Sequence, residues 1–271
     1  MAFIPSIKPP LKADMPDYWF IFSKHKLLVK MDRDKILIPT SRDIADYGLK
    51  PENQVYLGRL DDHPCYGAGI KGDLEQLPQL GFHSIRELFG LLSDDVWSAA
   101  GYGLHLTHWN ENHRYCSRCG EPMEDKKDER AKICPKCHAM KFPRINPCII
   151  VAVIKGNKIL LARSSRFPNR KLYSVLAGYV EPGETLEGCV QREVKEEVNV
   201  EVTHIRYFGS QPWPFSRSLM VGFTAEYAGG QIQIDGREIV DAGWYAADAL
   251  PEVPGWGSIA GRLIDWFVKS K

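Results

Sequence analysis

Three glutamates in one short segment are the clearest chemical feature of the sequence. Glu193, Glu196 and Glu197 are spaced by three and four residues, so a helix would place them on one face. Carboxylates this close repel each other, whereas a hard divalent cation such as Mg²⁺ binds carboxylate oxygens and offsets the repulsion. Arg192 is placed to bind a neighbouring carboxylate. A divalent-cation site is one interpretation of this segment, and a solvated acidic helix face is the other.

Four cysteines form a second group with the spacing of a metal site. Two C-x2-C pairs are separated by fourteen residues, a spacing that makes four unrelated free thiols a poor explanation. Four thiolates complete a tetrahedral zinc shell with no open position, so we predict one structural Zn²⁺ per chain. His113 and His138 flank the pairs, but four sulfur ligands already suffice. The predicted ligands are Cys116, Cys119, Cys134 and Cys137.

A third stretch, S-Q-P-W-P-F-S-R-S-L-M, begins at Ser210 and carries two large aromatic rings. Pro212 and Pro214 flank Trp213 and would stiffen an exposed loop. Aromatic side chains usually pack in a core, whereas rings held on a stiff loop offer a flat surface for stacking. We therefore predict a loop that binds a base or a nicotinamide ring.

Local signals predict the elements that position these groups. A buried strand leads to Pro182-Gly183, and Thr185 then caps the helix that carries the glutamates. Asn199 would end this helix, because Asn tolerates the left-handed conformation found there. Further strands are expected at 148–154, 159–163, 172–176, 204–208, 219–227, 231–234 and 242–245, with an amphipathic helix at 259–268.

The N-terminal part carries no motif that indicates chemistry. Residues 1–108 are expected to form an α+β domain, followed by a zinc ribbon at 109–143 and a third domain at 144–271. Short β-prone runs predict strands at 18–22, 26–30, 35–38, 55–60 and 66–70. Capping signals predict helices at 84–92 and from 96 towards 103.

Composition excludes several classes of protein. The 271 residues are 44% hydrophobic and 25% charged with a net charge of +1, so nothing demands a polyanion or a membrane surface. The longest apolar run, at 148–154, is too short to span a bilayer. Seven cysteines, an odd number, fit a reducing compartment, and we expect a cytoplasmic protein.

The order of residues from Gly178 resembles the Nudix box, G-x5-E-x7-R-E-U-x-E-E-x-G-U with U apolar. The match includes Glu184 and R-E-V-K-E-E, and Asn199 replaces the last glycine. The stretch from Ser210 resembles the S-Q-P-W-P-F-P-x-S-L-M array of the NADH pyrophosphatase branch of Nudix hydrolases, with Ser216 in place of the third proline. The resemblance covers roughly residues 84–271, because ribbon, box and array follow one another as they do in that branch.

This resemblance implies an α/β fold, with a Nudix α/β/α sandwich preceded by a zinc ribbon and an α+β N-terminal domain. It implies hydrolysis of the pyrophosphate bond of NAD(H) to nicotinamide mononucleotide and AMP, and removal of NAD caps from RNA 5′ ends. The cofactors would be a structural Zn²⁺ and a catalytic Mg²⁺ or Mn²⁺, and the enzyme would be a homodimer. The chain would have no membrane partner.

The resemblance also implies residue roles. Catalysis would use Glu193, Glu196, Glu197 and Glu238. The catalytic cation would be held by Glu193, Glu197, Glu238 and the backbone carbonyl of Ala177. Phe142 stands where the branch has Tyr, so a stacking contact is kept and a hydroxyl contact is lost. Substrate contacts would come from Arg86, Glu129, Phe142, Ser210, Gln211, Pro212, Trp213, Pro214, Phe215, Ser216, Arg217 and Ala260.

Two alternatives stay open at this point. A broader hydrolase of the same family would act on ADP-ribose or dinucleoside polyphosphates. A different class would be a nucleic-acid-binding regulator with a ribbon and an inert Nudix-like domain, although inert copies usually lose acids of the box and none is lost here. The general base is equally open among Glu196, Glu197 and Glu238.

Overall fold

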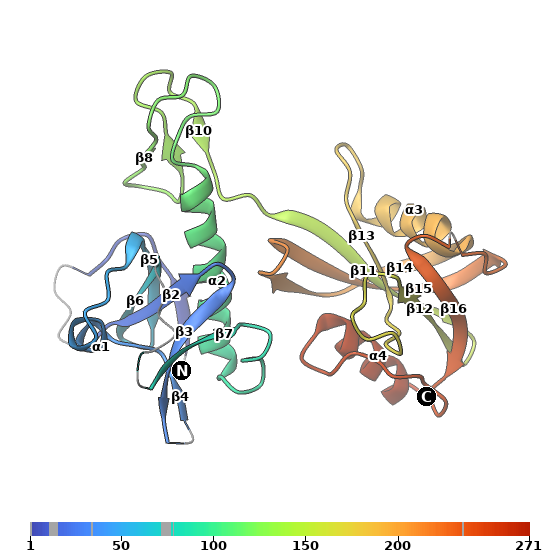
Figure 1. Cartoon of the computed structure of the whole chain (residues 1–271). Coiled ribbons are helices and arrows are strands. Elements are labelled where there is room, and N and C mark those ends of the chain that lie inside the picture. Colours follow the sequence, from blue (N-terminus) through green and yellow to red (C-terminus); the bar gives the residue numbers. More distant parts are fainter. Residues whose placement is uncertain (1, 11–15, 34, 72–76, 78, 235) are drawn as a thin grey trace. The chain divides into compact units, whose positions relative to one another are not determined.

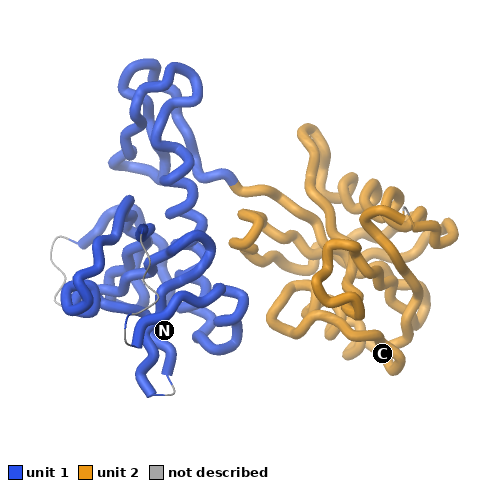
Figure 2. Tube along the Cα trace, viewed as in Figure 1, with its two compact units in different colours: residues 1–144 blue, residues 145–271 orange. Residues whose placement is uncertain are grey.

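The computed structural model describes residues 2–10, 16–33, 35–71, 77, 79–234 and 236–271. The chain forms two compact units, residues 1–144 and 145–271 (Figure 2). The predicted boundary at 108/109 lies inside helix α2 (Asp94–Asn112). The N-terminal α+β part and the ribbon both belong to the first unit.

Unit 1 is built on a sheet with the strand order β1-β5-β6-β2-β3-β4, with β7 paired to β3. Its helices are α1 (Ser41–Asp46) and α2, and α2 packs on β5 and β6. The predicted α+β architecture is therefore confirmed. The strands are β1 (Phe3–Pro5), β2 (Tyr18–Ser23), β3 (Lys26–Asp32), β4 (Lys35–Leu37), β5 (Glu52–Leu60), β6 (His63–Gly69) and β7 (Leu80–Ser84).

The helical predictions in unit 1 were partly wrong. The N–H of Ser84 donates to Glu87 Oε2 (3.1 Å) as a capping box requires, but residues 85–91 make turns, and Gly90 among them has φ +77°, which a helix does not allow. Helix α2 begins after the Ser93 cap and continues well beyond Gly103. A Cβ on Gly103 would lie 3.0 Å from the Leu57 side chain, so this glycine permits close packing and does not end the helix. No helix in the described part of the chain has the length and apolar character to cross a membrane.

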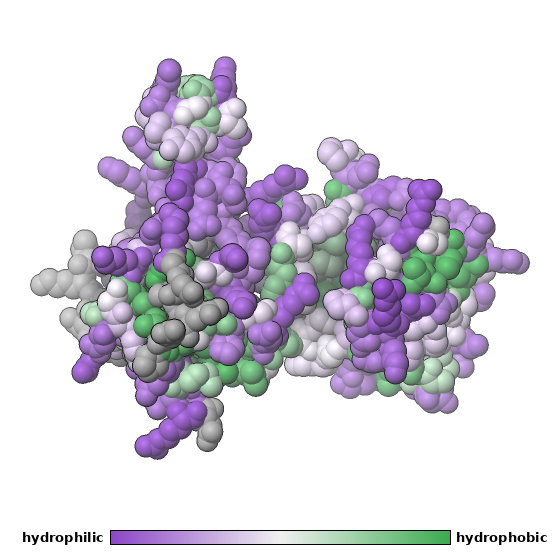
Figure 3. Space-filling view, viewed as in Figure 1, coloured by the Kyte–Doolittle hydropathy of each residue, from purple (hydrophilic) through white to green (hydrophobic). Residues whose placement is uncertain are grey.

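The zinc ribbon is a small sheet, and Arg130 is one of the side chains that connect it to the rest of unit 1. Its strands β8 (Glu124–Asp125), β9 (Lys132–Ile133) and β10 (Met140–Lys141) pair in the order β10-β9-β8. The guanidinium of Arg130 donates to the carbonyl oxygens of Tyr56 (2.9 Å) and Ser6 (2.6 Å). Figure 3 shows mainly hydrophilic side chains over the ribbon, with a small hydrophobic area at its tip. Its buried cluster is small and consists of Cys116, Met123 and Cys134, so the ribbon buries little apolar surface of its own.

Unit 2 contains a mixed sheet with the order β14-β15-β11-β12-β16, with β13 paired to β11. Strands β11 and β15 are parallel, and the other pairs are antiparallel. The strand predicted at 231–234 does not form, and β14 is much longer than predicted. The strands are β11 (Asn146–Lys155), β12 (Lys158–Ser164), β13 (Leu176–Tyr179), β14 (Val200–Trp213), β15 (Ser218–Gly230) and β16 (Ile239–Ala246).

Two helices cover opposite faces of this sheet (Figure 1). Alternate residues of β11 point to opposite faces. Ile149 and Val151 pack with α3 (Leu186–Val198), whereas Ile150 and Ala152 pack with α4 (Ile259–Lys269). The predicted α/β/α sandwich is confirmed, and α3 is the helix that carries the glutamates.

Candidate active site

Both ends of α3 are fixed by the residues that the sequence indicated. The hydroxyl of Thr185 accepts the Gly188 N–H (3.1 Å) at the N-terminus. Asn199 adopts φ +57° at the C-terminus, and its N–H bonds to the Lys195 carbonyl (2.9 Å). The turn thus survives the replacement of glycine, and the helix register that positions the glutamates is set at both ends.

Arg192 is the centre of the acidic cluster. It donates through Nε and Nη2 to both oxygens of Glu184 (2.8 and 2.9 Å), and through Nη1 to Glu193 (2.8 Å) and Glu196 (3.1 Å). A further bond reaches the carbonyl of Tyr179 on β13 (3.0 Å). The guanidinium beside Glu184 lowers the pKa of that carboxyl to about 2. The predicted arginine lock is confirmed, and it ties the glycine-rich turn to the helix.

Glu193 lies directly over the backbone of Gly178. A Cβ built on this glycine would come within 1.8 Å of the Glu193 carboxyl carbon, so a side chain at position 178 would displace the Glu193 carboxylate. Burial raises the pKa of Glu193, although the bond from Arg192 lowers it. Only 14% of the Glu193 side chain is exposed, against 60% for Glu196. The two acids therefore differ in environment although both bond to the same arginine.

Glu193 and Glu197 both influence the pKa of one buried thiol. Burial, together with the negative charges of these two glutamates, raises the pKa of Cys148 on β11 to about 12. Ala177 on β13, whose carbonyl is a candidate ligand, pairs with Ile150 on β11, the strand that also carries Cys148. Two carboxylates and a carbonyl are the hard oxygen donors that Mg²⁺ and Mn²⁺ take, so these residues fit the cation that the box implies.

Glu238 lies just before β16, apart from the helix in sequence. It pairs with Arg166 (Nη2 to Oε1, 2.5 Å), and the Ser165 N–H donates to its carbonyl (2.8 Å). In the described part of the chain, only the four cysteines bring three or more acidic, His or Cys ligand atoms within 4.8 Å of one another. The acids instead pair with arginines: Glu184, Glu193 and Glu196 with Arg192, and Glu238 with Arg166.

Arg192→Lys is expected to lower the Tm of unit 2 by about 5–10 °C, because lysine keeps the charge but loses several charge-assisted bonds. Glu184 makes the stability of unit 2 depend on pH in the acid range, since its pKa is lower in the folded state than the ordinary value of 4.5. Its contribution is complete above that value and is lost as the pH falls towards about 2. Thermal scans from pH 7 to 3 measure both effects. Arg206→Lys, at an exposed position on β14, is the matched control, and equal Tm values for both variants would contradict the role of Arg192.

The aromatic stretch forms the tip of the β14–β15 hairpin. Trp213 ends β14, and residues 214–217 make the turn before β15. The Trp213 and Phe215 rings meet edge to face with centroids 5.1 Å apart, and both are half-buried, while Pro214 is buried. The predicted exposed loop is thus a turn with half-buried rings, because strand pairing continues through Pro212 to Trp213.

Gln211 connects this hairpin to α4. Its Nε2 donates to the Gly257 carbonyl (2.9 Å), and its Oε1 accepts the Ile259 N–H (2.7 Å). Ala260 is the next residue of α4, so the structure brings this predicted contact next to the array. The amide of Gln211 is therefore occupied by backbone groups of the chain itself.

Three predicted substrate contacts belong to unit 1. Arg86 lies in the turns at 85–91, Glu129 pairs with Lys126 in the ribbon (3.2 Å), and Phe142 is 53% exposed after β10. The box, the array and Ala260 belong to unit 2. Their roles as substrate contacts remain predictions.

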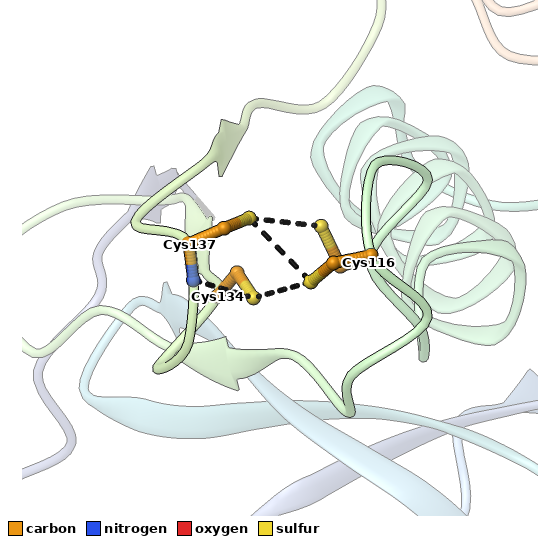
Figure 4. A group of neighbouring side chains, drawn as sticks. Cys116, Cys134 and Cys137 are labelled. Atoms are coloured by element: carbon orange, nitrogen blue, oxygen red, sulfur yellow. Dashed lines mark hydrogen bonds between the residues drawn. The ribbon is translucent and has the colours of Figure 1, made fainter.

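The four predicted zinc ligands converge in the ribbon (Figure 4). Three sulfur–sulfur distances are 3.5–3.6 Å, close to the edge of about 3.8 Å in a tetrahedron with Zn–S bonds of about 2.3 Å. The N–H of Arg118 donates to Cys116 Sγ (3.4 Å) and that of Cys137 to Cys134 Sγ (3.4 Å), and these bonds lower the pKa of both thiols. The donor set therefore fits zinc.

Sequence reasoning missed several residues around the site. Tyr179 bonds to Ser218, Asn146 bonds to the array turn, and Arg166 pairs with Glu238. The partners are separated by 39, 70 and 72 residues. The only signal for Tyr179 was its place beside Gly178. Arg166 lies in a basic loop at 164–171 that the sequence indicated as solvated or phosphate-facing, and Asn146 gave no signal.

Comparison with protein families divides the chain into three regions. Residues 144–267 match the NUDIX domain, and residues 111–142 match the NADH pyrophosphatase zinc ribbon domain. Residues 16–109 match an NADH pyrophosphatase-like rudimentary NUDIX domain, a relationship that the N-terminal sequence did not suggest to us.

Curated proteins and a solved structure are also similar to this chain. A protein of Pseudomonas fluorescens (strain Pf0-1) named NAD-capped RNA hydrolase NudC is 42% identical over 95% of this chain and 92% of its own. A Pseudomonas putida (strain W619) protein of the same name is 46% identical over 78% of this chain and 76% of its own. A crystal structure of a NUDIX hydrolase from Nitrosomonas europaea is 26% identical over 58% of this chain and 88% of its own, with a TM-score of 0.46.

Proposed function

The chain belongs to the NADH pyrophosphatase branch of the Nudix hydrolase family, and on this premise we propose that it hydrolyses the pyrophosphate bond of NAD(H). The products are nicotinamide mononucleotide and AMP. We propose the same cut at NAD-capped RNA 5′ ends, because a cap presents the same dinucleotide and curated relatives carry that activity in their name. The observation that carries the proposal is the intact acidic cluster around Glu193.

The residues take the following roles in this proposal. Glu193, Glu197, Glu238 and the Ala177 carbonyl would hold Mg²⁺ or Mn²⁺, which when bound neutralises pyrophosphate charge and lowers the pKa of a bound water. Arg192 keeps Glu193 in place over Gly178. A carboxylate accepts the proton of the attacking water, and the candidates are Glu196, Glu197 and Glu238.

The half-buried rings of Trp213 and Phe215 support a stacking role for the hairpin tip. We also propose a homodimer, supported by large apolar side chains that unit 2 exposes, among them Tyr207 (65%) and Trp256 (68%). A cytoplasmic location follows as a proposal from the zinc site, because thiolate ligands persist in a reducing compartment.

The test is incubation with NADH and with an NAD-capped oligonucleotide in Mg²⁺ or Mn²⁺, followed by mass identification of the products. We expect reduced nicotinamide mononucleotide with AMP from NADH, and oxidised nicotinamide mononucleotide with a 5′-monophosphate end from the NAD-capped RNA. ADP-ribose and diadenosine polyphosphates at equal concentration serve as competitors. Preferential cleavage of the competitors would overturn the substrate assignment, and absence of any cleavage would favour a binding protein.

A further inference from the structure

Three hydroxyl groups connect β13 to the ring-bearing turn of the array. Tyr179 Oη lies 3.2 Å from Ser218 Oγ, which lies 2.9 Å from Ser216 Oγ. Ser218 Oγ also lies 3.4 Å from the Ser216 carbonyl as a donor. Ser218 is buried, whereas half of Tyr179 is exposed. This chain of hydroxyls therefore begins next to Gly178, the residue that Glu193 covers, and ends in the turn that carries the rings.

The turn has little support within itself. One backbone bond closes it, from the Arg217 N–H to the Pro214 carbonyl (3.3 Å). Arg217 has φ +55°, a left-handed conformation that is costly for a residue with a side chain. Asn146 supplies two bonds from β11, to the carbonyls of Arg217 (2.9 Å) and Ser216 (3.2 Å). Contacts from neighbouring strands therefore help to determine its conformation.

Position 216 is where this sequence departs from the array pattern. Proline there would restrict the backbone through its ring. Serine lacks that restriction, but its hydroxyl gives the turn a side-chain bond to Ser218 and, through it, to Tyr179. A proline ring or the chain of hydroxyl bonds would therefore have the same effect, which is to restrict the backbone conformations of the turn.

We propose that Tyr179 is a positioning residue, whose hydroxyl holds the Trp213–Phe215 turn in place through Ser218 and Ser216. Where it concerns substrate, the inference rests on the proposed function. The effect falls on binding, because the hydroxyl bonds to the turn and leaves the bonds of Arg192 with Glu193 intact. Tyr179 thereby couples the strand beside the acidic helix to the surface proposed to hold the ring of the substrate.

Tyr179→Phe removes the hydroxyl and keeps the ring. We expect amide exchange in peptides spanning 213–218 to accelerate about fivefold, and KM for NADH to rise about fivefold with kcat within about twofold, the factor expected for one hydrogen bond. Tyr227→Phe is the control, because the Tyr227 hydroxyl also makes one hydrogen bond in unit 2, to the Gly230 carbonyl (2.7 Å), at the end of β15 away from the turn. The control should change neither quantity.

A rescue separates positioning from a general loss of stability. Ser216→Pro in the Tyr179→Phe background is expected to return exchange and KM to within about twofold of the original, because the ring restricts the turn. Ser218→Ala should add little to Tyr179→Phe, because both break the same chain of bonds. Unchanged exchange in Tyr179→Phe, or a defect that Ser216→Pro does not relieve, would overturn the inference. If the unmodified enzyme leaves NADH intact, the proposed function fails, and the exchange comparison alone decides the role of Tyr179.

Discussion

Glu197→Gln is expected to lower kcat for NADH cleavage by about 10²- to 10⁴-fold, the range typical for loss of a general acid or base. The amide has nearly the shape of the carboxylate but lacks its charge, so it weakens a cation site and cannot accept the proton from water. The charges of Glu197 and Glu193 both raise the pKa of Cys148, so both carboxylates lie near this buried thiol. Burial also raises the pKa of Glu193 itself. Steady-state rates at saturating Mg²⁺ or Mn²⁺ measure the loss, and a thermal scan checks folding.

Glu187→Gln is the matched control for this variant. Glu187 lies in the first turn of the same helix and is exposed, so the same change there removes only its interaction with the helix dipole. We expect kcat within about twofold of the original for the control. Near-normal turnover of Glu197→Gln would remove Glu197 from the catalytic group. A Tm much lower than that of the control would assign it a structural role instead.

The acidic site was predictable because its signals are local. Thr185, Arg192 and Asn199 each act within about one to three helical turns of the glutamates, and the structure gives them the contacts that the sequence indicated. The alternation of buried residues along β11 follows from the same kind of reasoning. Sequence therefore determined the helix, its caps and the two-sided core of the sandwich.

Contacts between distant segments were not predictable. Arg166 pairs with Glu238, and Gln211 connects the hairpin to α4, because the folded chain brings these segments together. Local rules also failed where packing decides the outcome. The helix predicted from 96 towards 103 continues to Asn112, and Gly103 lies inside it, where α2 approaches Leu57 closely.

The N-terminal domain shows a different limit. Its sequence contains no acidic box, and we could assign it no chemistry, yet it matches a rudimentary Nudix domain. A fold can persist after its site residues are gone, because packing of the core does not require them. The β-prone runs and helix-capping signals predicted an α+β domain here, but the kinship came only from comparison.

Loss of zinc is expected to unfold the ribbon, because the metal ligands make up most of its core. Cys116 and Cys134 are buried together with Met123, and Cys137 and Ala139 pack against them. Structural zinc contributes about 10–16 kcal/mol to such small domains, far more than this apolar cluster supplies. Cys134→Ala should therefore contain no zinc, against one ion per chain in the original protein, and amides of residues 116–137 should exchange within seconds. Metal analysis and amide exchange measure the two results.

The effect should extend to the rest of unit 1 through Arg130. This side chain bonds to the Tyr56 and Ser6 carbonyls and lies over the Tyr102 ring (5.9 Å), so an unfolded ribbon leaves those groups without their partner. Protection of β5 should fall, while that of α3 in unit 2 should hold. His138→Asn is the control, because Asn accepts φ +56° and the structure places four sulfurs, and no imidazole, at the metal position. Zinc loss in this control would make His138 a ligand, and a protected ribbon in metal-free Cys134→Ala would show that the core holds without zinc.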